Sequence, residues 1–159
     1  MSFEYWFSHS LDDVLGRLQD AAFLEGRSAA LGDERCSCNV QGAGDEVVVT
    51  TDRLVALKLP KVALKFFQPK QSMRMVETWR REGDGWAGSY HVDIEGQPLV
   101  IDATFSLVTV PTGCVLRMEH TPFVDIPLVR KPAEKFILGT IVDGTRQECD
   151  YLRDQLDGA

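Results

Sequence analysis

The sequence has no long apolar run and no leader-like beginning. No stretch of its 159 residues is apolar for long enough to cross a bilayer as a helix. The first residues, Met1 to Tyr5, contain neither the basic segment nor the apolar core of a secretory signal. We therefore expect a cytoplasmic protein with no integral membrane contact.

Positive charge is scarce as well. Seventeen Lys and Arg residues stand against 24 Asp and Glu residues, which gives a formal net charge of −7. Because nucleic acids and anionic membranes attract positive charge, this balance disfavours both as partners. The length and the ordinary composition indicate one domain, residues 1–159, that is large enough to bury a core.

Cysteine is too sparse to predict a disulfide framework or a zinc site. The chain has four cysteines, of which only Cys36 and Cys38 lie close together. A zinc pair needs about two to four intervening residues and a second pair elsewhere, and the sequence supplies neither. We interpret the thiols as structural, expect no metal and no other cofactor, and leave the role of Cys36 and Cys38 open.

Motifs of the common enzyme classes are missing from the sequence. It contains no Walker loop, no G-x-G-x-x-G, no H-E-x-x-H and no G-x-S-x-G. No Ser or Cys stands in a context that marks it as a nucleophile, although such groups are assembled in space. Hydrolase and transferase chemistry are unsupported, and we assign no catalytic residue.

What the sequence does contain is one long helical pattern, residues 129–156, with Pro132 in its first turn. One face has Asp143, Arg146, Gln147, Asp150, Arg153 and Asp154. The other face carries a stripe at spacings of three and four residues. This stripe consists of Phe136, Ile137, Thr140, Ile141, Gly144, Thr145, Glu148, Cys149 and Leu152. Its small and polar members argue against a coiled coil and predict a helix that crosses a curved sheet without filling the space beneath it.

Alternating segments and turn signals fill the rest of the chain. Ser10 with Asp13 predicts a helix start, and Gly26 is expected to divide the helical segment 11–31 into two short helices. Residues 54–69 are ambiguous, extended at first and then more like a short amphipathic element. The expected strands, which are separated by Gly-containing turns, cover residues 3–8, 35–41, 46–52, 70–81, 86–94, 99–110 and 114–124.

This order of elements is accompanied by three informative segments. They are Phe3-Glu4-Tyr5, Glu77-Thr78-Trp79, and Val124-Asp125-Ile126-Pro127-Leu128 ahead of the long helix. With them the chain resembles the START-like (SRPBCC) superfamily and, more narrowly, a bacterial family of unknown function, DUF2505. The resemblance implies an α+β helix-grip fold. In that fold a curved antiparallel sheet of about six to seven strands wraps around a long C-terminal helix, and two short helices follow the first strand.

The same resemblance implies a deep cavity between sheet and helix that holds a lipid, a polyketide or another small apolar ligand. Strand alternation and the helical stripe then select the side chains that face this cavity. The candidate ligand-binding residues are Met73, Met75, Glu77, Trp79, Tyr90, Ile101, Phe105, Met118, His120, Phe136, Ile137, Thr140, Ile141, Gly144 and Glu148.

Glu77 and His120 are the ionisable residues that fall in apolar company on the strands. Burying either without a partner is costly, so each is expected to have one. In a functional role they form either a polar handle for a ligand head group or an acid/base pair. In a structural role His120 is a core histidine with its hydrogen bonds made, and Glu77 is a carboxylate at the rim of the sheet that pairs with Arg74, Arg80 or a helix residue.

Three functions remain open from the sequence. The first is a non-catalytic carrier or sensor of a small apolar ligand. The second is a cyclase- or dehydratase-like enzyme that uses His120 and Glu77 on a polyketide-type substrate. The third is a partner-binding module whose cavity is filled by side chains. The cavity volume and the distance between these two residues distinguish them. The sequence leaves the ligand and the oligomeric state undetermined.

Overall fold

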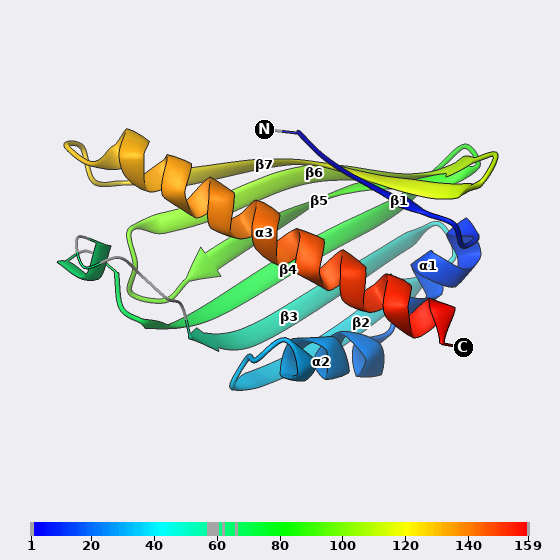
Figure 1. Ribbon diagram of the computed structural model, residues 1–159, viewed down its shortest axis with the longest axis horizontal. Coiled ribbons are helices and arrows are strands. Elements are labelled where there is room, and N and C mark those ends of the chain that lie inside the picture. The colour runs from blue at the N-terminus through cyan, green and yellow to red at the C-terminus, as the bar shows by residue number, and fades with distance from the viewer. Residues whose placement is uncertain (1, 57–60, 62, 66, 159) are drawn as a thin grey trace.

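The computed structural model describes residues 2–56, 61, 63–65 and 67–158, and it has the expected α+β helix-grip architecture (Figure 1). Seven strands and three α-helices are described, together with the short 3₁₀ helix η1 (Ala63–Lys65). The strands are β1 (Ser2–Phe7), β2 (Arg35–Ala43), β3 (Glu46–Ala56), β4 (Lys70–Glu82), β5 (Gly85–Ile94), β6 (Leu99–Val110) and β7 (Gly113–Val124). The helices are α1 (Leu11–Leu18), α2 (Ala21–Ala30) and α3 (Arg130–Asp157).

All seven strands form one antiparallel sheet in the order β1-β7-β6-β5-β4-β3-β2. The six strands from β2 to β7 therefore form a meander, and the last strand, β7, pairs with the first strand of the chain, β1. The sheet curves, and α3 lies diagonally across its concave face (Figure 1). Gly83 and Gly96 adopt positive φ at hairpin turns, which a residue with a Cβ rarely tolerates.

The two short helices are divided at a different place from the one that the sequence predicted. Asp20, not Gly26, separates them, because its carboxylate accepts a hydrogen bond from the Ala22 amide at 3.1 Å and caps α2. Gly26 lies inside α2 without breaking it. The predicted start of α1 is confirmed, since the Ser10 hydroxyl accepts from the Asp13 amide at 3.2 Å.

The ambiguous segment 54–69 is extended where it begins. Strands β2 and β3 run on to Ala43 and Ala56, so the hairpin is longer than predicted. The short amphipathic element corresponds in place to η1. Residues 57–60, 62 and 66, which include part of the predicted alternation, lie outside the described residues.

Inward-facing side chains form rows across the concave face because the antiparallel strands pair in register. One row joins Trp79 on β4, Gly88 on β5 and Phe105 on β6. A Cβ at Gly88 would lie 2.7 Å from the Phe105 ring, so the missing side chain lets the two aromatic rings meet with centroids 4.5 Å apart. The next row carries buried Trp86 and Leu107. This end of the sheet is therefore filled by its own side chains.

Helix α3 packs firmly only over that filled end. Cys149 and Leu152 are its buried residues, and Leu152 is 0% exposed. Toward the N-terminal end of the same stripe, Phe136 is 37% exposed and Thr140 is exposed as well. The predicted stripe thus has a packed C-terminal part and a loosely packed N-terminal part. Among the described residues, no helix is long and apolar enough to span a membrane.

This division predicts different stability losses along one helix. Leu152→Ala should lower the free energy of unfolding by about 3 kcal/mol, as large-to-small changes in a packed core do. Phe136→Ala should cost about 1 kcal/mol, and Leu128→Ala, at a leucine that is 97% exposed, should cost close to nothing. Urea unfolding with unchanged m-values measures all three. Equal losses for Leu152→Ala and Phe136→Ala would show that both halves of α3 are core.

Candidate ligand-binding site

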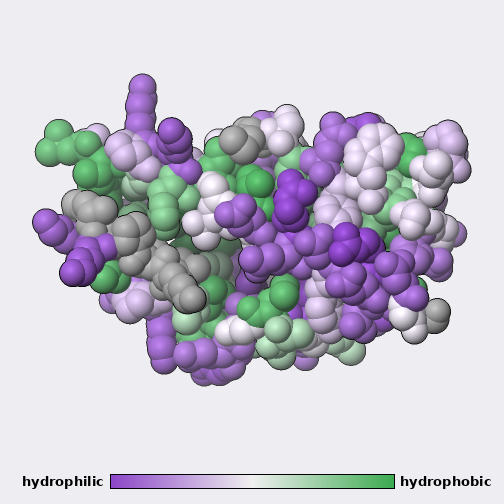
Figure 2. Space-filling model, in the orientation of Figure 1, coloured by the Kyte–Doolittle hydropathy of each residue, from purple (hydrophilic) through white to green (hydrophobic). Residues whose placement is uncertain are grey.

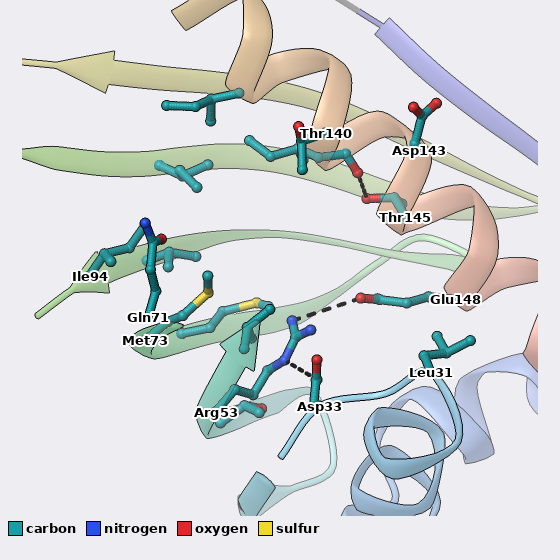
Figure 3. A pocket seen from close by; sticks show the side chains of 18 of the residues that line it. Leu31, Asp33, Arg53, Gln71, Met73, Ile94, Thr140, Asp143, Thr145 and Glu148 are labelled. Atoms are coloured by element: carbon teal, nitrogen blue, oxygen red, sulfur yellow. Dashed lines mark hydrogen bonds and ion pairs between the residues drawn. The ribbon is translucent and has the colours of Figure 1, made fainter. Parts of the chain in front are cut away.

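A cavity of about 430 Å³ lies between the sheet and the central part of α3, from Phe136 to Glu148. Strands β3 to β6 supply one side and α3 supplies the other, while the segment after α2 closes the flank (Figure 3). The lining residues from the sheet are Thr51, Arg53, Val55, Ala56, Gln71, Met73, Met75, Tyr90, Val92, Ile94, Leu99 and Ile101.

The floor of the cavity is two apolar cross-strand rows. Met73 pairs with Ile94 in one row, Met75, Val92 and Ile101 occupy the next, and Leu99 at the start of β6 also lines the cavity. The two methionines are only half-buried, whereas their neighbours on β5 and β6 are buried. Flexible thioether side chains at an open surface adapt to varied apolar shapes.

Between the larger lining residues of the helix, Thr140, Gly144 and Thr145 present little side-chain volume to the cavity. Apart from its chain neighbours and the backbone of its own helix, no atom of the described residues lies within 4 Å of where a Cβ at Gly144 would stand, so the sheet does not approach it. The Thr140 and Thr145 hydroxyls donate to the α3 carbonyls of Phe136 and Ile141 at 3.1 and 2.9 Å. Their polarity is satisfied inside the helix, and the space beneath remains open.

A chain of ion pairs forms one flank of the cavity. Arg53 on β3 donates through Nε to Asp33 Oδ2 at 2.8 Å, and its Nη1 lies 3.8 Å from Glu148 on α3 (Figure 3). Glu148 in turn pairs with Arg27 of α2 at 3.0 Å, and Ser28 donates to Asp33. Opposite charges thereby tie the long helix to α2 and to β3 across the flank of the cavity.

The sequence prediction included Glu148 and missed Arg53, Asp33 and Gln71. A signal for Arg53 was present, because alternation from Val47 and Val49 on β3 places it on the inward face. Asp33 lies in the connection after α2, where no helical or strand periodicity indicates which way a side chain points.

Gln71 is the second polar feature of the lining. It is 3% exposed, and its Nε2 donates to the Gln68 carbonyl at 3.2 Å. Its Oε1 has no hydrogen-bond partner among the described residues. A buried amide oxygen of this kind is an available acceptor for a ligand hydroxyl or amine.

The structure brings ten of the fifteen candidate residues to the cavity wall. They are Met73, Met75, Tyr90, Ile101, Phe136, Ile137, Thr140, Ile141, Gly144 and Glu148. The five that do not line it are Glu77, Trp79, Phe105, Met118 and His120. These five share the concave face but lie in the rows nearer the filled end. Asp143 and Gln147, which the helical pattern placed on the opposite face, are lining residues.

Glu77 and His120 occupy one row with Tyr90 between them. The register runs from Glu77 to Tyr90, then to Ala103 and His120, so two strands, β5 and β6, lie between the strands that carry Glu77 and His120. His120 is 2% exposed, and its Nδ1 lies 2.7 Å from the Tyr90 hydroxyl. The partner of His120 is therefore Tyr90, which the sequence did not identify.

The electrostatics of this row favour neutral groups. Burial lowers the pKa of His120 and raises that of Tyr90. Burial also raises the pKa of Glu77 to about 7, although the Arg27 charge lowers it and the Glu148 carboxylate adds to the rise. Glu77 makes no hydrogen bond or ion pair with any described residue, while Arg74 and Arg80 pair with Asp52 and Glu46 instead.

A family model described as a protein of unknown function, DUF2505, matches residues 2–156. The chain belongs to this family. The DUF2505 match covers the sheet and nearly all of α3, so the family is defined by the whole helix-grip domain. A search of curated proteins finds no match.

Solved structures of bacterial proteins have a similar fold. An uncharacterised protein from Rhizobium leguminosarum has a TM-score of 0.63 at 13% identity, with 100% of this chain and 94% of that chain covered. A protein from Mesorhizobium loti has a TM-score of 0.57 at 18% identity, with coverage of 100% and 97%. A protein from Chromobacterium violaceum has a TM-score of 0.55 at 16% identity, with coverage of 98% and 94%. At these identities the similarity shows the fold alone.

The raised pKa of Glu77 predicts a pH-dependent stability. Between about pH 4.5 and about pH 7 the folded state keeps a proton that the unfolded state releases, so stability should fall as pH rises through this window and then level off. The full effect is at most about 3 kcal/mol. Glu77→Gln should remove it and raise stability at neutral pH. Urea unfolding of both proteins at several pH values measures the difference. An identical pH dependence in the variant would contradict the assignment.

Proposed function

We propose that the protein is a non-catalytic carrier or sensor that binds one small, largely apolar molecule in the cavity between the sheet and α3. The observation that carries this proposal is the unfilled volume of about 430 Å³ under the central part of the helix, between Phe136 and Glu148. Small-molecule sites commonly occupy roughly 300–1,000 Å³ and are mostly apolar.

The chemistry of the lining supports an apolar ligand with one polar group. The floor rows offer only hydrocarbon and thioether surface, which gains free energy when water is displaced. The Gln71 Oε1 is an open acceptor, and Arg53 keeps guanidinium N–H groups beyond the one that Asp33 accepts. Because Asp33 and Glu148 already balance the charge of Arg53 and Arg27, a hydroxyl or carbonyl suits the flank better than a second carboxylate.

The two other functions receive less support. An enzyme that pairs Glu77 with His120 needs both groups at one substrate, whereas neither lines the cavity and Tyr90 stands between them. A module with a filled interior needs side chains where the cavity is open. Lipids and polyketides both fit a mainly apolar lining, so native mass spectrometry of the purified protein is the most direct way to identify what is bound.

The glycines of α3 provide a matched test. Gly144→Leu should place a side chain into the open space and weaken binding of an aminonaphthalene dye or a fluorescent fatty acid at least tenfold, because it removes volume from the site. Gly139→Leu is the control. Gly139 also has open space around it but does not line the cavity, and both changes improve helix propensity by a similar amount.

Fluorescence titration measures the affinity, and urea unfolding shows that both variants remain folded. The proposal expects a selective loss in Gly144→Leu. Dye binding that is absent from the wild-type protein, or weakened equally by the two substitutions, would contradict it.

A further inference from the structure

The lysines of this acidic chain are confined to two short segments. All six lie at positions 58–70 and 131–135. Together, residues 57–70 and 127–136 hold seven basic residues and one acidic residue, Glu134, whereas the remainder holds 10 basic and 23 acidic residues. The net charge of −7 therefore conceals a strong separation of charge along the sequence.

The fold brings η1, in the first segment, and the start of α3, in the second, to one end of the molecule (Figure 1). Figure 1 places η1 and the start of α3 at the same end of the long axis. Lys61, Lys65, Lys131 and Lys135 are exposed there, and none of the four forms an ion pair with a described residue. Lys70 is the exception, since it pairs with Glu34 at 2.8 Å.

Large apolar side chains are exposed at the same end. Leu128, just before α3, is 97% exposed, and Leu64 in η1 is 49% exposed. Phe123 is 42% exposed, and the Arg130 guanidinium lies 4.4 Å from its ring centroid. Figure 2 shows hydrophobic residues gathered over the start of α3, in contrast to the hydrophilic surface around its C-terminal half. We call this combination of lysines and apolar side chains the basic-apolar end.

We propose that the basic-apolar end docks the protein on the surface of an anionic lipid membrane. Lys side chains interact with anionic head groups, while leucine and phenylalanine side chains enter the boundary between head groups and acyl chains. The negative charge on the rest of the molecule is repelled by the same surface, so that it orients the protein with this end toward the lipid. The proposed contact is peripheral, because exposed side chains at one end of the molecule make it.

The proposed docking end adjoins the cavity. Phe136 lines the cavity, is 37% exposed and follows Lys135 directly in the first turns of α3. A membrane-bound molecule therefore holds this part of the cavity lining close to the lipid. Docking itself requires no ligand in the cavity, and its test is independent of dye binding.

Vesicle sedimentation tests the proposal directly. The wild-type protein should bind vesicles that contain phosphatidylglycerol, bind phosphatidylcholine vesicles weakly, and dissociate as NaCl is raised. The double variant Lys131→Gln/Lys135→Gln should bind these anionic vesicles about thirtyfold more weakly, because each basic residue near the membrane surface contributes about 1 kcal/mol. Leu128→Ser should reduce it about tenfold.

The matched control is Arg80→Gln/Arg81→Gln, which removes the same charge from two exposed residues near the opposite end of β4. This variant should bind vesicles as the wild type does. All variants change exposed residues, and urea unfolding checks that they remain folded. Equal loss in the control, no preference for phosphatidylglycerol, or no binding at low salt overturns the proposal. So does a dimer in size-exclusion chromatography that Leu128→Ser converts to a monomer, because a second copy would then cover this end.

Discussion

The whole interior of this protein follows from the register of its antiparallel sheet. In-register pairing places inward side chains in rows, and each row has its own character: aromatic and filled, polar, or apolar and open. The filled rows depend on Gly88. Because Gly88 has no Cβ, the rings of Trp79 and Phe105 meet above it and fill this end of the concave face. A one-residue slip would send every one of these side chains to the convex face.

Helix α3 completes the interior differently at its two ends. At the aromatic end it contributes Leu152 to a close-packed core, where the free energy of folding is concentrated. Over the cavity, Thr140, Gly144 and Thr145 stand among larger residues, and ion pairs of Glu148 with Arg27 and Arg53 help to hold the helix where apolar packing is looser. The helix remains positioned over a space that it does not fill. A cavity in the interior normally lowers the free energy of unfolding. Here the close-packed end of the sheet and α3 supplies most of the stability.

Much of the fold was predictable because it depends on local patterns. Turn glycines, strand alternation and the long helical stripe predicted all seven strands and α3 with small errors at their ends. The site was predictable only in part. Alternation identifies the inward face but not the position along it, so Glu77 and His120 were correctly placed on the concave face yet lie beyond the cavity. Asp33 and the link from His120 to Tyr90 depend on which elements meet in three dimensions, and no local pattern contains that information.

The net charge of the chain is a poor guide to whether the protein is attracted to a membrane, for a physical reason. Electrostatic attraction to a surface falls off within about a Debye length, roughly 8–10 Å at moderate ionic strength, so a membrane responds to the nearest charges and not to the sum. A molecule whose four unpaired described lysines, Lys61, Lys65, Lys131 and Lys135, gather at one end presents that end to the membrane, and its acidic remainder reinforces the orientation. The apolar side chains exposed among those lysines point to a lipid surface, since a purely polar anion offers them nothing. The same end carries the start of α3 and the loosely packed side of the cavity, so the two proposals concern neighbouring parts of one structure.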